Sequence, residues 1–411
     1  MRHIHQPVWL DAVARAGAPA FIALFALDTL ARATLVTVVP LQALELLGNA
    51  QKVSVLYLAV STAGLAGSFS VPWLVRRIRR RWTLSLGALG YIVAAPLLTL
   101  HSLEGLIAGM AAYLFGGACA SICLNLYVLD HVPRGSFTRF EPTRMLFSGC
   151  GWFVGPALGV YLETRVAGWA PYAASAAFAL AALAYFWFLR LTEHPMVGAV
   201  AAPPPNPIRF VRRFFAQPRL ALAWLLAMGR AGWWGMFYIY VPIYAVTTGL
   251  GEEAGGLISS AGSAALFAVT FWGWVGRRFG IRNLLVAGFA ASGALTIGVA
   301  LAAGVPWAGA VVLVVAAVAA SVTDGAGNVL FLRAVRIRER AEMTTVYASY
   351  RDVARLSTPG LYALMLQVFA LPAVFATSGL IMLALGAVAR FVPRRLGREP
   401  RAALRAAPAG R

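Results

Sequence analysis

Two charged residues interrupt the first long apolar stretch of this sequence, residues 19–47. Asp28 and Arg32 lie four residues apart, which places them on one face of a helix. At 1.5 Å per residue, Asp28 lies roughly 14 Å inside the stretch, near the middle of a bilayer. An ionisable group at that depth is costly unless it has a partner or a function. We therefore predict that Asp28 binds and releases a proton; a local ion pair that only neutralises both residues is the alternative.

Arg230 interrupts a later apolar stretch, residues 219–247. Trp234 and Tyr238 follow it at one and two helical turns and share its face. Aromatic rings beside a guanidinium can hold a planar or apolar molecule by stacking or cation–π contact. Aromatic packing between neighbouring helices explains the same pattern, so both interpretations stay open.

A third set of charges lies further along the chain: Asp324, Arg351, Asp352 and Arg355. Arg351 and Arg355 are one turn apart and share a face. Mixed charge inside a membrane suits ion coupling or substrate selection, and a neutralised structural network is the alternative.

Other chemistry is not indicated by the sequence. The cysteines and histidines lie in predicted helices, near helix ends or in tails, so no metal site is visible. A phosphate-binding loop needs a lysine after its glycines, and the single lysine, Lys52, has no such setting. No nucleophile stands with a base. We predict that the protein is not an enzyme and needs no cofactor or metal.

These residues must be positioned by helices that cross a membrane. The 411 residues are 60% hydrophobic and only 12% charged, and about twelve segments approach the ~20 apolar residues that a transmembrane helix needs. The segments are 19–47, 53–76, 82–101, 105–130, 143–163, 169–191, 219–247, 254–276, 283–303, 306–333, 344–369 and 372–392. The sequence therefore predicts an all-α integral membrane protein.

Arginine is concentrated on every second connection between the segments, as in the runs at 76–81, 209–219, 277–282 and 336–340. By the positive-inside rule, these connections and both termini lie in the cytoplasm. The net charge of +20 then serves topology and contact with lipid headgroups rather than nucleic acid. Short external connections without an Asn-x-Ser/Thr site favour a bacterial inner membrane.

The chain reads as two halves with the same plan. Pro40 and Pro242 are 202 residues apart, Arg76 and Arg278 keep that spacing, and the same spacing aligns Asp28 with Arg230. We predict a six-helix bundle at 1–191, a cytoplasmic linker with an amphipathic segment at 192–218, a second six-helix bundle at 219–392 and a basic cytoplasmic tail at 393–411.

Six plus six helices with a cytoplasmic linker resemble the major facilitator superfamily, and the resemblance covers nearly the whole chain. Residues 75–80 keep the arginines of that family's loop between helices 2 and 3, without its Asp and Gly. A second segment is similar to the Gly-x-x-x-Gly-Pro-x-x-Gly motif most often seen in the family's exporters, with Gly151, Gly155, Pro156 and Gly159. Its physical content is close helix packing and a kink; a packing seam without information on direction is the alternative. The Arg typical of helix 4 in proton-linked drug antiporters is missing.

In that family the two halves rock about a central substrate site. The resemblance therefore implies two pseudo-symmetric bundles of that fold, with Asp28, Arg32 and Arg230 lining one shared cavity. It also implies a gate at the cytoplasmic helix ends that stabilises the outward-open state. The gate residues would be Arg76 or Arg80 with Asp130, and Glu141 with Arg144.

The sequence favours a secondary active transporter that moves a small organic molecule by alternating access, as a proton-coupled exporter and a monomer in the lipid bilayer. Proton-linked or facilitated transport of an organic anion is the alternative within this class, because of the arginines in the spans. A non-transporting membrane sensor or scaffold is the alternative from another class. Substrate identity and charge, direction, coupling ion and oligomeric state are not determined by the sequence.

Overall fold

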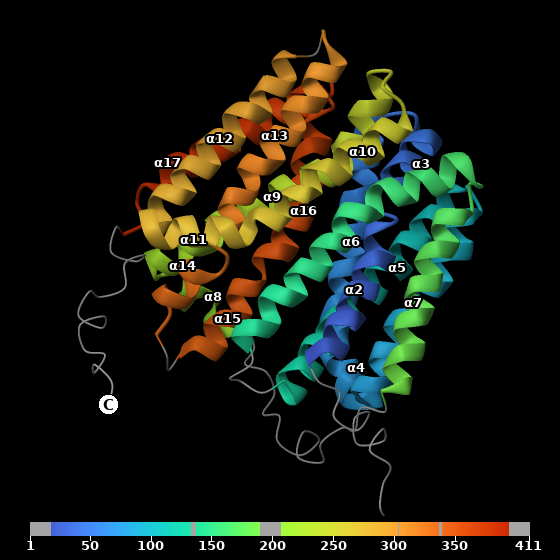
Figure 1. The fold of residues 1–411 in the computed structure, drawn as a ribbon, viewed down its shortest axis with the longest axis horizontal. Coiled ribbons are helices and arrows are strands. Elements are labelled where there is room, and N and C mark those ends of the chain that lie inside the picture. Colours follow the sequence, from blue (N-terminus) through green and yellow to red (C-terminus); the bar gives the residue numbers. More distant parts are fainter. Residues whose placement is uncertain (1–17, 133–136, 190–206, 303, 337–338, 394–411) are drawn as a thin grey trace, which may run out of the picture. The chain divides into compact units, whose positions relative to one another are not determined.

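The computed structural model describes residues 18–132, 137–189, 207–302, 304–336 and 339–393 (Figure 1). Every regular element in these ranges is a helix. In the first part of the chain they are α2 (Ala18–Ala33), α3 (Val38–Leu47), α4 (Ala50–Thr99), α5 (Leu103–His131), α6 (Phe137–Arg165) and α7 (Ala170–Phe188). After α8 (Pro207–Phe215) follow α9 (Pro218–Thr247), α10 (Glu252–Ser263), η3 (Ala264–Ala268), α11 (Val269–Phe279), α12 (Ile281–Leu301), α13 (Pro306–Asp324), α14 (Val329–Ala334), α15 (Arg340–Ala348), α16 (Tyr350–Met365) and α17 (Pro372–Ala389).

Nine helical segments in the described part of the chain are long and apolar enough to span a membrane. One of them, Ala50–Thr99, is two helices in physical terms, because Arg79 has non-helical backbone angles. The arginine-containing α9 and the neighbouring pair α15 and α16 lie where two further spans are predicted. The described helices thus fit the twelve predicted segments, and the prediction of an all-α membrane protein is confirmed.

Several predicted segments are broken rather than straight. The first consists of α2 and α3, separated by a turn that precedes Pro40. Proline has no N–H to donate to the preceding turn, and its ring crowds that turn's carbonyl. Segment 306–333 is similarly divided into α13 and α14, with Gly327 at a φ of 49° in the connection. Segment 254–276 passes through the 3₁₀ turn η3 between α10 and α11.

The described residues divide into two compact units. Of the described residues, those up to 189, 238–264 and 359–367 form unit 1, and 207–237, 265–358 and 368–393 form unit 2. The boundaries run through α9, η3 and α16, so unit 1 includes one end of each of these helical segments. The division into bundles at 1–191 and 219–392 stays a prediction.

Each unit has its own core. In unit 1 a cluster of large buried side chains joins α2, α5 and α7, and includes Phe21, Phe25, Tyr127 and Phe186. In unit 2, α12 and α17 approach closely at Gly293 and Gly379, where a Cβ added to Gly293 would lie 2.8 Å from the Gly379 carbonyl oxygen. Small residues at such crossings let helix backbones pack closely inside a membrane. We call the helix ends next to the arginine-rich connections the arginine-rich side, and the other ends the opposite side.

Candidate functional site

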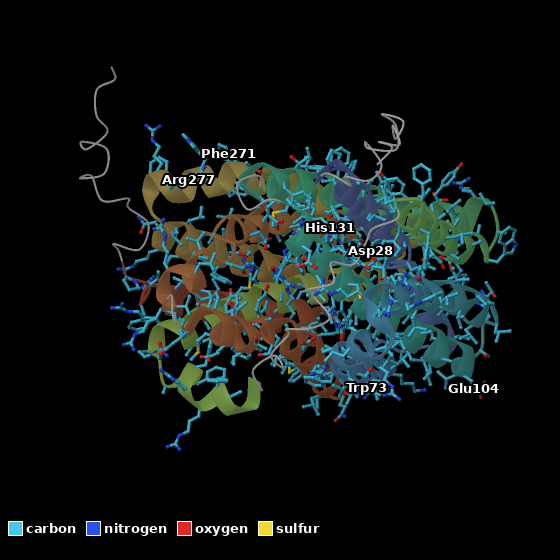
Figure 2. All side chains as sticks on the ribbon, turned by 90° about the horizontal axis from the view of Figure 1, so that it is seen from below. Asp28, Trp73, Glu104, His131, Phe271 and Arg277 are labelled. Atoms are coloured by element: carbon cyan, nitrogen blue, oxygen red, sulfur yellow. The ribbon has the colours of Figure 1, made fainter. Side chains whose placement is uncertain are left out.

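Asp28, which is labelled in Figure 2, forms an ion pair with Arg32 inside unit 1. The Arg32 Nη2 lies 2.8 Å from Asp28 Oδ2, and Asp28 is only 3% exposed. The Tyr91 hydroxyl on the second part of α4 donates to Asp28 Oδ1 at 3.2 Å. Tyr113 on α5 donates to the backbone oxygen of Arg32 at 2.8 Å. Three helices therefore hold one enclosed carboxylate and its counter-charge.

A cavity of ≈ 30 Å³ lies next to this pair, lined by Asp28, Tyr91 and apolar residues that include Leu24, Leu84 and Leu124. A volume of that size has room for water. The carboxylate is thus enclosed by protein and adjoins a small internal space.

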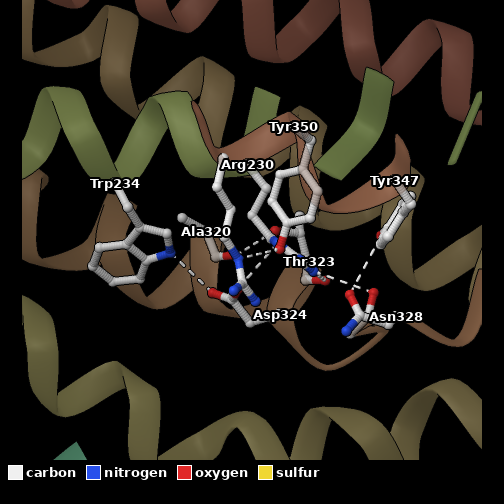
Figure 3. A network of polar contacts seen from close by, with 10 residues as sticks. Arg230, Trp234, Ala320, Thr323, Asp324, Asn328, Tyr347 and Tyr350 are labelled. Carbon is white, nitrogen blue, oxygen red and sulfur yellow. Dashed lines mark hydrogen bonds and ion pairs between the residues drawn. The ribbon is translucent and has the colours of Figure 1, made fainter. Parts of the chain in front are cut away.

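Arg230 forms a second ion pair, inside unit 2 (Figure 3). Its Nε lies 3.2 Å from Asp324 Oδ1, and the Trp234 indole N–H donates to the other carboxylate oxygen at 2.9 Å. Arg230 Nη1 also donates to the backbone oxygen of Thr323 at 3.3 Å. The Tyr350 hydroxyl accepts a further hydrogen bond from Arg230.

The structure thus places the predicted residues in two groups. Asp28 pairs with Arg32, and the pseudo-symmetric Arg230 pairs with Asp324, with Trp234 bound to the same carboxylate. Each group lies within its own unit. The single cavity shared by Asp28, Arg32 and Arg230 stays a prediction.

Asp324 is therefore joined to α9 rather than to the arginines of α16. The Arg351 Nε donates to the Tyr350 hydroxyl at 3.1 Å, and both Arg351 and Arg355 are exposed. Among the described residues, neither arginine lies within 4.0 Å of a carboxylate oxygen in an ion pair, and the half-buried Asp352 has no ion-pair partner at that distance.

Tyr238 belongs to unit 1. Its hydroxyl shares a hydrogen bond of 2.9 Å with Ser263, and its ring packs against Trp152 of α6 with the centroids 4.9 Å apart. These contacts use the Tyr238 side chain in helix packing. Trp234, one turn earlier, binds a carboxylate instead.

The predicted gate residues form two ion pairs on the arginine-rich side of unit 1. Arg80 pairs with Asp130, whereas Arg76 is exposed. Arg144 Nε donates to Glu141 Oε2 at 2.9 Å, and the Arg144 guanidinium also lies 4.7 Å from the Phe25 ring centroid. Of the two arginines predicted as the partner of Asp130, Arg80 is therefore the one that forms the ion pair.

The three glycines of the α6 motif face α2. A Cβ added to Gly151, Gly155 or Gly159 would lie 2.9 Å, 2.4 Å or 1.9 Å from an atom of Thr29, Ala33 or Thr34. At Pro156 the carbonyl accepts a hydrogen bond of 3.0 Å from Thr37. The motif is therefore the seam along which the two helices touch.

Sequence reasoning missed the tyrosines that complete both groups: Tyr91, Tyr113 and Tyr350. The position of Tyr350 next to Arg351 was the only local signal. Tyr91 and Tyr113 lie 63 and 81 residues from their partners, and no spacing rule relates residues that far apart.

Comparison with known proteins identifies the fold. The family model described as Major Facilitator Superfamily matches residues 21–359. Similar solved structures include the peptide transporter POT in complex with sulfate, with a TM-score of 0.71 and 14% identity over 92% of this chain and 94% of that one. The nucleoside transporter NupG has a TM-score of 0.69 and 12% identity, covering 90% of this chain and 98% of that one. A D-xylose-proton symporter has a TM-score of 0.65 and 14% identity, covering 93% of this chain and 98% of that one. A search of the curated proteins found no match.

At these identities the solved structures show a common fold and nothing about the substrate. The family model extends over most of the chain, from α2 to α16. The chain belongs to the Major Facilitator Superfamily and is a multi-pass membrane protein of the secondary-transporter type.

Proposed function

We propose that this transporter couples the export of a small amphipathic organic molecule to protons, and that Asp28 is the proton-binding carboxylate. The observation that carries the proposal is the enclosed Asp28, held by Arg32 and Tyr91 within one unit. In a carboxylate removed from water and placed against one cation, desolvation favours the neutral form and the cation favours the charged form. Alternation between those states is what proton coupling requires.

The proton step involves three side chains. When Asp28 is charged, it accepts from Tyr91 and is paired with Arg32. When it takes up a proton, the attraction to Arg32 falls and the guanidinium is free to contact another anion or dipole. Movement of the Arg32 side chain can then alter what the transporter binds, which links protonation to transport.

The proposed substrate contacts come from the second group and its neighbours in unit 2: Arg230, Trp234, Asp324, Arg351, Asp352 and Arg355. The Trp234 ring lies beside a charge pair, so it could contact an amphipathic molecule through its face while the pair meets a polar group. Export is supported by the glycine and proline motif of α6. The arginine-rich loops support a cytoplasmic position for both termini in a bacterial inner membrane.

A second candidate function is proton-linked transport of an organic anion. It is favoured by the exposed Arg351 and Arg355, which lie one turn apart without an ion pair among the described residues. Two guanidinium groups on one helix face can bind a carboxylate or phosphate.

The decisive experiment measures internal pH in proteoliposomes during addition of lipophilic cations and organic anions. The wild type is compared with Asp28→Asn and with Glu104→Gln, an exposed acid at the start of α5 that serves as the matched control. We expect substrate-driven proton movement opposite to the substrate, abolished in Asp28→Asn and unchanged in Glu104→Gln.

Three other outcomes would change the proposed function. Proton movement in the same direction as an organic anion would support the second candidate. Transport at the wild-type rate by Asp28→Asn, with its pH dependence intact, would remove Asp28 from the mechanism. Uptake of a labelled compound without proton movement would make the protein a facilitator.

A further inference from the structure

An apolar groove of ≈ 530 Å³ runs between α6 and α10 on the surface of unit 1. Its walls include Phe153, Val154 and Tyr161 from α6 and Leu257 from α10. These side chains are 41%, 45%, 58% and 62% exposed, respectively. Both helices lie in candidate membrane spans, so the groove opens on a surface that faces the bilayer.

The floor of the groove is closed because the two helices touch. A Cβ added to Gly256 would lie 3.1 Å from Val160, and the backbone N–H of Ala157 donates to the Ser260 hydroxyl at 2.9 Å. Ser260 is 5% exposed and lines the groove. The space is thus a pocket on the lipid-facing surface with a well-packed base.

The groove is slightly shorter than the hydrocarbon layer of one leaflet is thick. From Phe153 to Tyr161 the helix rises about 12 Å at 1.5 Å per residue, and half of a ~30 Å hydrocarbon core is about 15 Å. The span that contains these residues runs from Thr143 to Arg165. The groove therefore extends from near the middle of the span towards the opposite side.

A charged pair lies at that end. Arg165 Nε donates to Glu253 Oε1 at 2.7 Å and Nη2 donates to Oε2 at 3.2 Å. The two side chains are 61% and 48% exposed, and Glu253 also lines the groove. A guanidinium has five N–H donors, of which this pair uses two, so an approaching phosphate can find donors on the same group.

We propose that this groove binds a glycerophospholipid of the leaflet on the opposite side, with one acyl chain between Phe153 and Leu257 and the phosphate beside Arg165. An acyl chain gains nothing from the hydrophobic effect when it leaves other acyl chains. Its gain is the dispersion contact that fills the void between the two helices, together with the phosphate contact. Because α6 and α10 come from different halves of the sequence, the bound lipid stabilises their contact.

The test uses the full-length protein in liposomes that contain phosphatidylglycerol with a photoactivatable diazirine in one acyl chain. After illumination, mass spectrometry maps the labelled peptides. We expect labelling concentrated in residues 153–161 and 257–261, and reduced by excess unlabelled phosphatidylglycerol.

Two matched variants make the result specific. Ala261→Trp places a large ring in the groove from an exposed position, and Ala177→Trp adds the same ring to an exposed position on α7 at a similar depth. We expect loss of groove labelling only in Ala261→Trp, with unchanged melting temperatures in both variants.

The proposal is overturned if peptides 153–161 and 257–261 are labelled no more than α7, or if both tryptophan variants lose label equally. Displacement of the label by a transported compound, but not by phosphatidylglycerol, would make the groove a substrate entry route and would also overturn it. The labelling needs neither a substrate nor a proton gradient, so its outcome is independent of the proposed transport mechanism.

Discussion

At the scale of single residues, unit 1 contains a buried acid and unit 2 a half-buried acid, each paired with an arginine, but the two pairs are built differently. Asp28 and Arg32 share one helix and are four residues apart. Arg230 and Asp324 come from α9 and α13 and are bridged further by Trp234. Asp28 and Arg230, which the internal repeat aligns, thus carry opposite charges, and each is paired with a residue of the opposite charge.

Removal of one partner of the Arg230 and Asp324 pair is expected to destabilise the protein more than removal of both. The side chains are 12% and 20% exposed, so a single Arg230→Gln or Asp324→Asn change leaves a largely buried charge unpaired. We expect each single change to lower the free energy of unfolding by about 3 kcal/mol, and the double change to recover at least ~1 kcal/mol of that loss. Denaturant unfolding in detergent measures all three.

Transport assays of the same variants distinguish a structural role of the Arg230 and Asp324 pair from a role in substrate binding. A double variant that regains stability but transports nothing would assign the pair to the substrate site. Additive losses would show that the two side chains do not interact, contrary to the geometry.

How far such pairs can be predicted depends on where the partner lies. Asp28 and Arg32 were found from the sequence because helical periodicity alone brings them together. Asp324 was grouped with Arg351 and Arg355, which are near in sequence, whereas its partner lies 94 positions earlier. The packing of α9 against α13 decides that choice, and no local pattern encodes it.

At the scale of helices, the seam between α6 and α2 depends on residues without side chains. Gly159→Ala is expected to lower the free energy of unfolding by about 1–3 kcal/mol, the usual cost of overpacking. The added methyl group would lie 1.9 Å from the Thr34 carbonyl oxygen, which is backbone and cannot rotate away. Thermal unfolding followed by size-exclusion chromatography measures the effect. Gly168→Ala is the control, since the nearest atom to its added Cβ is 3.8 Å away; equal losses in both variants would refute the explanation.

The turn between the two parts of α4 carries a strained residue. Arg79 has φ 70° and ψ 159°, a region that is essentially restricted to glycine and costs other residues about 1–3 kcal/mol. In the corresponding turn between α11 and α12 the residue with positive φ is Gly280, at 95°. The second turn therefore has a glycine at its positive-φ position, while the first has an arginine.

Arg79→Gly is accordingly expected to raise the melting temperature. The relieved strain exceeds the roughly 0.5–1 kcal/mol that a glycine costs in chain entropy. Arg77→Gly is the matched control, because Arg77 is an exposed residue inside the helix and its replacement should cost about 1 kcal/mol. A lower melting temperature for Arg79→Gly would show that the Arg79 side chain contributes more than its backbone loses.

The sequence predicted the positions of the helices because length and apolar content determine a membrane span. It did not predict where they break. Pro40 and the glycine at 327 are visible in the sequence, but proline also occurs without a break, as Pro72 and Pro96 do within the two parts of α4. Whether such a residue breaks a helix depends on the neighbours that replace the lost hydrogen bonds.

At the scale of the molecule, specific contacts on the opposite side join segments from the two halves of the sequence within unit 1. Ser54 on α4 shares a hydrogen bond of 2.6 Å with Tyr240 on α9. The Ala157 N–H donates to Ser260, and Arg165 pairs with Glu253. On the arginine-rich side, by contrast, the Arg80 and Asp130 pair joins two helices of the same half. The internal repeat suggests two equivalent halves, and only the structure shows which helix ends join them in unit 1.

Mutations on these two sides should therefore change the labelling rate of one reporter cysteine in opposite directions. Val160 is 1% exposed and packs against Gly256, so a cysteine in a Val160→Cys, Cys150→Ser protein reacts with a maleimide only when the contact between α6 and α10 opens. Tyr240→Phe with Ser260→Ala removes one hydrogen bond between α9 and α4 and one between α10 and α6, each worth about 1 kcal/mol. We expect labelling to become roughly thirtyfold faster, because the two losses together amount to about 2 kcal/mol.

Asp130→Ala should act in the other direction. If the Arg80 and Asp130 pair stabilises the outward-open state, its loss reduces the fraction of molecules in which the opposite side is open. An exposed ion pair contributes about 0–1 kcal/mol, so labelling of Val160→Cys should become slower by no more than about fivefold, without loss of folded protein. Tyr161→Phe, an exposed position on the same helix, should leave the rate unchanged. Faster labelling in Asp130→Ala would mean that the pair holds the protein in the inward-open state, and an unchanged rate would remove it from the gate.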